Sequence, residues 1–154
     1  MAQTITTAML VIASLIAAIA LINAVLPATG KSASALAAAN SEAARRIKTD
    51  IDIIYATGNT SGTITMWVKN VGTQVIRSVE DSDIFIIKPT GVSRLTYVSG
   101  CSSECWDYEL EDSKSAWTTA VTVKFTVTTS VAAGSYSVSI AAPNGVTAVK
   151  DFSV

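Results

Sequence analysis

The sequence predicts a mainly β protein: an immunoglobulin-like antiparallel β-sandwich preceded by a long N-terminal apolar helix. The first thirty residues contain no charged side chain, and from Asp50 onward short β-branched and aromatic runs alternate with turn formers. Once the helical part of the 154-residue chain is set aside, the remainder has the size of one domain. We therefore expect an apolar helix at residues 1–30, an Ala-rich helical stalk at residues 31–49 and the sandwich at residues 50–154.

An almost unbroken apolar run, Ala8–Leu26, forms the centre of the first part. At about 1.5 Å per residue, a helix of this length crosses roughly 30 Å of hydrocarbon, whereas the apolar region of a cleaved secretory signal has about 7–15 residues. The run therefore predicts a membrane anchor. Within it Ala13, Ala17, Ala20 and Ala24 recur at helical spacing, which predicts a face where a second helix approaches closely in lipid. The alternative is that these alanines reflect only the composition of the segment.

Pro27 and Gly30 follow this run and predict a kink or a break, because proline removes a helical hydrogen bond and glycine relaxes the backbone. A second helical stretch, Ser32–Lys48, carries a thin apolar stripe that includes Leu36 and Ile47. The stripe is too narrow to bury much surface. It indicates a stalk above the membrane, or a surface that packs on like helices in an assembly.

Short strands separated by turn signals follow Asp50. Ile51–Ala56 and Thr63–Asn70 predict a hairpin, because turn formers join them. The other strand candidates are Gln74–Arg77, Asp83–Ile87, Arg94–Val98, Trp106–Leu110, Ala120–Val127, Ser135–Ile140 and Thr147–Val154. Their regular spacing, with no helical pattern between them, favours an antiparallel sandwich. Edge pairing by Ile51–Ala56 or Ala120–Val127 would supply contacts between copies.

The two cysteines, Cys101 and Cys105, lie in the segment Cys-Ser-Ser-Glu-Cys. In an exported domain such a pair predicts a disulfide, and two free thiols are the alternative. A structural zinc site would need more ligands than a chain with no histidine and no other cysteine readily supplies. The lack of histidine also removes the commonest general base near neutral pH.

Two acidic clusters are the richest sources of oxygen ligands. The first comprises Glu104, Asp107, Glu109, Glu111 and Asp112, and the second comprises Glu80, Asp81 and Asp83. Calcium is one interpretation, but in Trp106–Glu111 the carboxylates alternate with apolar residues, as on the solvated face of a strand. We therefore expect no metal site and no cofactor.

Composition also argues against other classes of function. The net charge is −1, with no cluster of Lys and Arg of the kind that neutralises phosphates, so we expect no nucleic acid partner. The sequence shows no Gly-rich phosphate loop and no nucleophile elbow, so we expect no catalytic residue and no small-molecule substrate. One N-glycosylation sequon, Asn59-Thr60-Ser61, falls in the predicted hairpin turn, where an acceptor would be exposed.

Several short segments resemble the archaellum accessory proteins, the archaeal flagellar proteins F and G, and the likeness is closer to G. They are the polar lead before the apolar helix, Arg46–Ile54, Trp67–Thr73 and Ser82–Phe85. The resemblance implies a membrane-anchored protein whose sandwich lies outside the cytoplasm and serves as the static part of a rotary motor. It also implies the partners: the S-layer protein or the sister accessory protein F, the archaellum membrane platform, and further copies of the chain. It supplies no catalytic residues.

The alternative is a filament subunit, an archaellin or archaeal pilin, which shares the order of helix and sandwich and packs its helices in a central bundle. Such subunits carry a basic leader, and no Lys or Arg precedes Lys31 in this sequence, so we expect the accessory role. A sandwich adhesin or other exported binding module is a third class, because sandwich folds serve many functions.

The basic residues Lys31, Arg45, Arg46 and Lys48 follow the apolar helix, and the positive-inside tendency would place them in the cytoplasm. The cysteine pair, the sequon and the family resemblance indicate the opposite side. No charge precedes the helix to compete, and most of these residues lie well beyond the membrane edge. We therefore expect a single-pass cell-membrane protein with its C-terminal domain outside.

Overall fold

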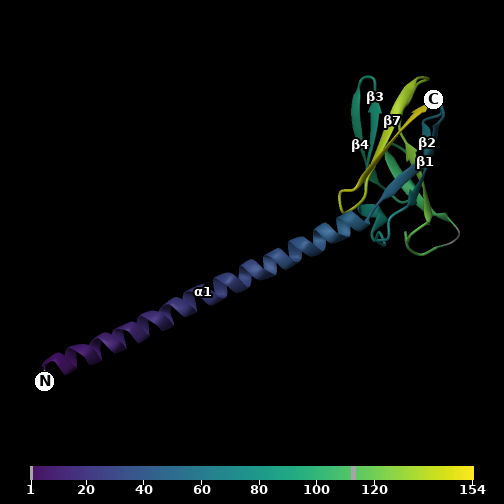
Figure 1. The fold of residues 1–154 in the computed structure, drawn as a ribbon. Coiled ribbons are helices and arrows are strands. Elements are labelled where there is room, and N and C mark those ends of the chain that lie inside the picture. The colour runs from purple at the N-terminus through teal and green to yellow at the C-terminus, as the bar shows by residue number, and fades with distance from the viewer. Residues whose placement is uncertain (1, 112–113) are drawn as a thin grey trace. The chain divides into compact units, whose positions relative to one another are not determined.

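The computed structural model describes residues 2–111 and 114–154. Within them, α1 (Ala2–Lys48) precedes an eight-stranded sheet folded into a sandwich, and a short 3₁₀ turn, η1 (Val79–Asp81), lies between β2 and β3 (Figure 1). The strands are β1 (Ile51–Gly58), β2 (Thr63–Asn70), β3 (Asp83–Lys88), β4 (Gly91–Tyr97), β5 (Cys105–Leu110), β6 (Thr122–Thr128), β7 (Ser135–Ala141) and β8 (Thr147–Ser153). The predicted fold class, an apolar helix followed by a β-sandwich, is confirmed. The chain divides into two compact units, Met1–Ala43 and Ala44–Val154.

The helix α1 continues through Pro27, so the predicted break at Pro27 to Gly30 is wrong. A proline inside a helix removes one backbone hydrogen bond, and the neighbouring turns keep theirs. Hydrogen bonds from nearby side chains to the backbone stabilise the helix around a proline. Here the Thr29 hydroxyl donates to the carbonyls of Val25 and Leu26, at 3.2 and 3.0 Å. The division of the helix into an anchor and a stalk stays a prediction.

The strands follow the order β1-β2-β6-β5-β4-β3-β7-β8 and form two layers, β1-β2-β6-β5 and β4-β3-β7-β8. The hairpin predicted from the first two strands is confirmed as the antiparallel pair β1–β2. All neighbours are antiparallel except β4 and β5, which pair in parallel through Thr96 with Cys105 and Tyr97 with Trp106. For this pair the antiparallel prediction is wrong. The connection after β4 first runs beside β5, where the Val98 amide donates to the Trp106 carbonyl, and then doubles back.

The predicted strand Gln74–Arg77 does not form. Ile76 makes a single isolated bridge with Trp117, and η1 follows. The backbone of Gln74 is bonded outside any strand ladder, because its carbonyl accepts from Asn70 Nδ2 at 2.8 Å and its amide donates to the Lys48 carbonyl at 3.1 Å. Ser78, with a φ of 54°, then turns the chain toward the second layer.

The core lies between the two layers and follows the predicted alternation. Val123, Phe125 and Val127 of β6 are fully buried. The Phe125 ring packs between two buried indoles, 5.6 Å from Trp106 and 5.8 Å from Trp117 between ring centroids. Each indole N–H is satisfied: Trp106 donates to the Leu95 carbonyl and Trp117 to the Val121 carbonyl, both at 3.1 Å. This aromatic centre lets a small domain bury large apolar side chains without unpaired polar groups.

The free edges of the sandwich are β1 and β8, which lie beside one another. The central place of β6, between β2 and β5, makes the predicted edge pairing by Ala120–Val127 wrong, because both sides of that strand are already paired. On β1 a register shift between Ile53 and Tyr55 interrupts the ladder. A bulge of this kind protects an edge strand from pairing with other chains.

Candidate functional site

The most distinctive surface of the chain is the helix α1. Every described side chain from Gln3 to Lys48 is exposed, and those of Leu10 and Leu15 are 71% and 62% exposed. The helix is long and apolar enough to cross a membrane, by length and composition. The small residues of the face that the sequence predicts, Ala13, Ala17, Ala20 and Ala24, are among the exposed ones. A surface this apolar requires lipid or other helices around it.

The end of α1 is fastened to the sandwich by backbone hydrogen bonds. The Lys48 carbonyl accepts from the amides of Thr73 and Gln74, at 2.9 and 3.1 Å, and the Asp50 carbonyl accepts from Gly72 at 3.0 Å. A Cβ on Gly72 would collide with the backbone of Lys48 and Asp50, so this approach requires glycine. The last carbonyl of α1, one of those without a partner inside the helix, is thereby satisfied.

Side chains reinforce the same junction. Thr49 is buried, and its hydroxyl donates to the Arg45 carbonyl at 3.0 Å and accepts from Asn144 Nδ2 at 2.6 Å. The Arg46 guanidinium donates to the Gly145 carbonyl at 3.3 Å. The turn between β7 and β8 is therefore tied to the last turn of the helix, residues 44–48. The sequence does not predict this junction, because its contacts join segments that are distant along the chain.

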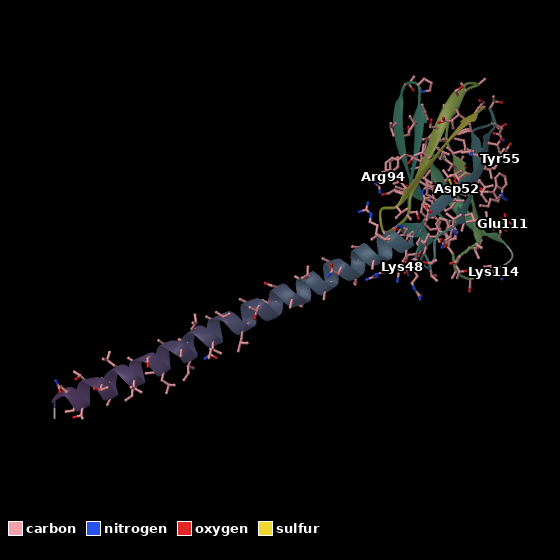
Figure 2. All side chains as sticks on the ribbon, viewed as in Figure 1. Lys48, Asp52, Tyr55, Arg94, Glu111 and Lys114 are labelled. Carbon is pink, nitrogen blue, oxygen red and sulfur yellow. A yellow bond between two sulfur atoms is a disulfide. The ribbon has the colours of Figure 1, made fainter. Side chains whose placement is uncertain are left out.

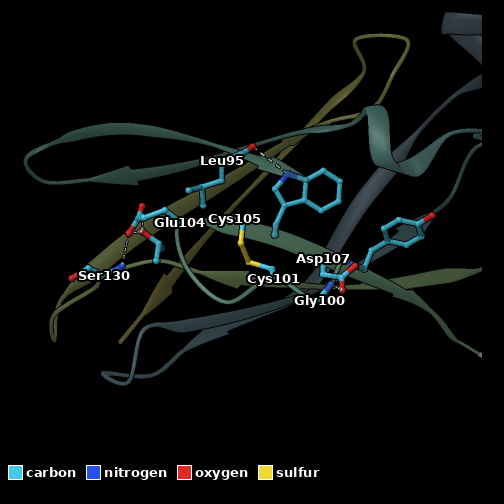
Figure 3. Close-up of a disulfide and its surroundings, with 10 residues drawn as sticks. Leu95, Gly100, Cys101, Glu104, Cys105, Asp107 and Ser130 are labelled. Carbon is cyan, nitrogen blue, oxygen red and sulfur yellow. Dashed lines mark hydrogen bonds between the residues drawn. A yellow bond between two sulfur atoms is a disulfide. The ribbon is translucent and has the colours of Figure 1, made fainter. Parts of the chain in front are cut away.

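Cys101 and Cys105 form a disulfide, as the sequence predicts (Figure 3). Two carboxylates hold the surrounding loop. Glu104, in a left-handed conformation with a φ of 49°, accepts hydrogen bonds at 3.1 Å from the Thr129 hydroxyl and the Ser130 amide. Asp107 accepts from the Gly100 amide at 2.8 Å. The loop is thus pinned both to the connection after β6 and to β5.

The first acidic cluster therefore has structural partners in the fold. Besides Glu104 and Asp107, Glu109 pairs with Lys124 across β5 and β6, at 3.6 Å. Glu111 lies just beyond β5, and Asp112 lies outside the described residues. Within residues 2–111 and 114–154, no three cysteine or acidic side chains are grouped as metal ligands would be.

The second acidic cluster lines a pocket of about 440 Å³ at the start of β3. Its lining residues are Glu80, Asp81, Ser82, Asp83, Arg94, Thr96 and Tyr97. Arg94, on β4, pairs with Asp83, with 2.9 Å between Nε and Oδ1; its position on the sandwich is marked in Figure 2. Beside the pocket the Tyr108 hydroxyl donates to Glu80 at 3.3 Å. Burial raises the pKa of the Tyr108 phenol, and the Glu80 carboxylate raises it further. We call this site the acidic pocket.

The sequon residue Asn59 lies exposed in the turn between β1 and β2, as the sequence predicts. Its side-chain oxygen accepts from the Thr63 amide at 3.0 Å, which fixes the side chain in the turn. This hydrogen bond uses the carbonyl of the amide and leaves its nitrogen, the atom that a glycan would modify, outside the bond. Glycosylation of Asn59 stays a prediction.

The comparisons with known proteins agree with this picture of helix and sandwich. A family model for archaeal-type flagellin matches residues 2–152. The archaellum periplasmic stator protein FlaG from Sulfolobus acidocaldarius is 25% identical, with a TM-score of 0.57, and the match covers 68% of this chain and 99% of that chain. A chain of the periplasmic stator complex of FlaF and FlaG from the same organism is also 25% identical, with a TM-score of 0.57, over 66% of this chain and 87% of that one.

A flagellin matches the fold as well. The archaeal flagellin FlaB1 from Methanocaldococcus jannaschii is 12% identical, with a TM-score of 0.56, over 69% of this chain and 90% of that chain. At this identity the likeness establishes the fold alone. No curated protein gave a significant match.

Proposed function

This chain belongs to the archaeal-type flagellin family and is a structural component of the archaellum, and on that premise we propose that it is a stator component of the archaellum motor. In this role α1 anchors the chain in the cytoplasmic membrane. The sandwich stands outside the cytoplasm and binds a fixed partner. The protein works by holding position against torque and performs no catalysis.

The observation that carries the proposal is the likeness to FlaG. The identity to this stator protein is 25% over 99% of its chain, against 12% to the flagellin FlaB1 at nearly the same coverage of this chain. Since the two likenesses have almost equal TM-scores, 0.57 and 0.56, the fold does not separate the two roles. The higher identity favours the stator.

The helix supports the anchoring half of the proposal. Its apolar side chains are exposed along the whole length between Gln3 and the first charged residue, Lys31. A bilayer satisfies such a surface, because each buried apolar Å² gains about 25 cal/mol. The Cys101–Cys105 disulfide supports an oxidising location for the sandwich, as such bonds persist outside the cytoplasm.

The partners follow from the same proposal. The complex of FlaF with FlaG supports a sister accessory protein of the F type as the partner of this sandwich. The S-layer protein is a second candidate for the fixed attachment, and the membrane platform of the archaellum is the neighbour of α1. The exposed alanine face of α1 supports association of copies within the membrane.

The second candidate function is a filament subunit, and one observation favours it. The archaeal-type flagellin model matches residues 2–152, which include the whole described length of α1 as well as the sandwich. In that role the exposed apolar helices of many copies would cover one another in a filament core instead of meeting lipid.

Shearing the filaments from cells that make the protein separates the two functions. We expect the chain to remain with the washed membranes, and the sandwich to be digested by protease added to wall-free cells. Recovery of the chain in the sheared filaments, with an N-terminus produced by leader cleavage, would support the filament subunit and contradict the stator.

A further inference from the structure

The acidic pocket carries negative charge that the fold does not neutralise. Asp83 is paired with Arg94, but the hydrogen bond that Glu80 receives comes from the neutral Tyr108 hydroxyl. The exposed Asp81 carboxylate has no hydrogen bond or ion pair with another described residue. Two carboxylates, Glu80 and Asp81, therefore remain to attract a cation at the mouth of the pocket.

A second feature of the pocket also indicates a missing partner. Ser82 lines the pocket, is 4% exposed, and its hydroxyl oxygen is buried with no hydrogen-bond partner among the described residues. A buried hydroxyl left unpaired costs about 1–3 kcal/mol. Tyr97 adds an aromatic ring to the wall, and such rings attract cations.

These groups match a basic side chain better than a metal ion. A lysine ammonium has three hydrogen-bond donors, which two carboxylates and one hydroxyl can accept. The Arg94 guanidinium in the same wall would repel a divalent ion more strongly than a single positive charge. The pocket therefore fits the end of a lysine supplied by a protein partner.

The chain itself carries basic residues at a complementary place. Arg45, Arg46 and Lys48, which we call the basic collar, lie in the last turn of α1, where cations also stabilise the helix end. The connection 71–82 joins collar and pocket, since Thr73 and Gln74 donate to the Lys48 carbonyl and the same segment ends at Ser82. Both features therefore lie at the end of the sandwich where β1 begins.

The collar and the pocket are two separate surfaces at this end of the sandwich. Arg46 contacts Gly145 in the turn between β7 and β8, at the edge where β8 lies beside β1. The pocket is lined by the start of β3 and by β4, and its Asp83 pairs with Ala141 of β7, just before that turn. One copy therefore presents both charges at the same end of the sandwich, and copies held in the same orientation can bring the collar of one to the pocket of the next.

We infer that the acidic pocket binds the basic collar of a second copy of this chain, with Lys48 as the side chain that enters the pocket. Among the collar residues, Lys48 has no side-chain partner in the described structure, whereas Arg46 is engaged by Gly145. The contact joins two different surfaces, so repetition gives a ring or an open helical row of copies. The inference rests on the proposed function, because anchoring in one membrane aligns the copies side by side.

Zero-length cross-linking tests this contact, because a carbodiimide joins an amine directly to a carboxylate. Two full-length copies are expressed together: one keeps Lys48 and carries Glu80→Gln and Asp81→Asn, and the other keeps the pocket and carries Lys48→Gln. Any link from Lys48 to Glu80 or Asp81 must then join two copies. We expect mass spectrometry to find this link in washed membranes, and about 1 M salt to weaken it, since the Debye length falls to about 3 Å.

The controls separate this contact from others. Lys48→Gln in both copies should abolish the link, whereas Lys150→Gln, which removes an exposed lysine of β8, should leave it unchanged. Lys48→Glu combined with Asp81→Lys should restore a link with the two chemical groups exchanged. Links elsewhere in the chain without one between these positions, or links from Glu80 and Asp81 to another protein, would overturn the inference. The fraction in which the chain is recovered tests the proposed function separately, because the link can be sought in membranes and in sheared filaments alike.

Discussion

The two units of the chain satisfy their apolar side chains in opposite ways. In Ala44–Val154 the large apolar residues are buried against one another, with Trp106, Trp117 and Phe125 fully covered. In Met1–Ala43 the described side chains are all exposed, although this unit is the more apolar of the two. The sandwich is therefore stable through its own contacts, whereas the helix depends on surroundings that the chain does not supply. Substitutions in the two units should accordingly affect different measurements.

The largest effect on stability is expected for Trp106→Ala. The indole is fully buried, packs against Phe125 and donates to the Leu95 carbonyl, so its removal leaves a cavity and an unpaired carbonyl. We expect a loss of about 3–5 kcal/mol in the free energy of unfolding of the sandwich, measured by urea denaturation of the full chain in detergent. Leu15→Ala, on the exposed helix, is the control and should change it by less than about 0.5 kcal/mol.

Removing the buried side-chain amide of Asn70 should cause the next largest loss of stability. Asn70 is fully buried, donates to the carbonyls of Gln74 and Trp117, and accepts from the Gly72 amide at 3.1 Å. Asn70→Ala removes these three hydrogen bonds and takes from the Gln74 carbonyl its side-chain partner, whereas the Trp117 carbonyl and the Gly72 amide each keep one backbone bond. We expect a loss of about 2–3 kcal/mol in the same measurement. Asn40→Ala, at an exposed position of α1, should be close to neutral. Equal losses for both variants would show that the helix is also held by contacts within the chain.

The disulfide should contribute less than the core. For a loop as short as that between Cys101 and Cys105, the chain-entropy model gives about 2 kcal/mol. The double variant Cys101→Ser, Cys105→Ser should lose about this amount while remaining folded, because Glu104 and Asp107 still hold the loop. Circular dichroism with urea titration checks this. Complete unfolding of the double variant would mean that the loop depends on the disulfide alone.

Substitutions in the helix should change the association of copies and leave the stability of the sandwich unchanged. Ala17→Leu enlarges the small-residue face and should reduce cross-linked oligomers in membranes, while the free energy of unfolding of the sandwich changes by less than about 0.5 kcal/mol. Ala18→Leu, about 100° around the helix, is the matched control. If the two variants associate equally well, the alanines reflect composition only.

The smallest expected effect is the pH dependence that Tyr108 gives to the stability of the sandwich. Burial raises the pKa of the Tyr108 phenol above 10.0, and Glu80 raises it further, so the folded chain keeps a proton that the unfolded chain releases. The contribution of this group to stability is complete below pH about 10 and declines as the pH rises through the folded pKa. Wild type should therefore lose more stability than Tyr108→Phe between pH 9 and 11, by urea titration at each pH. Parallel curves would contradict this assignment.

The division into an apolar helix and a sandwich with a buried core could largely be predicted from sequence, because it depends on local periodicity. The absence of charge in the first thirty residues identified the apolar helix, and the alternation in β6 identified the buried face that holds Phe125. The disulfide followed from the spacing of Cys101 and Cys105. These signals lie within a few residues of one another along the chain.

The features that the sequence did not predict depend on contacts between distant segments. The Gln74–Arg77 segment has the composition of a strand, but the Gln74 backbone bonds to the Asn70 side chain and to the Lys48 carbonyl instead of to a neighbouring strand. The parallel pairing of β4 with β5 depends on a connection that doubles back. The acidic pocket brings Glu80 together with Arg94 and Tyr97 only after β3 and β4 have paired. Periodicity along the chain contains none of this information.

Photo-cross-linking from the helix tests the central claim most directly. A photoreactive amino acid replaces Leu15, which is exposed in the middle of the apolar run, in the full chain in its native cells. If α1 is a membrane anchor, illumination should attach lipid to this position, and the adduct should be found in washed membranes. If the adducts join only protein to protein and are recovered with sheared filaments, the helix lies in a filament core and the stator assignment is wrong.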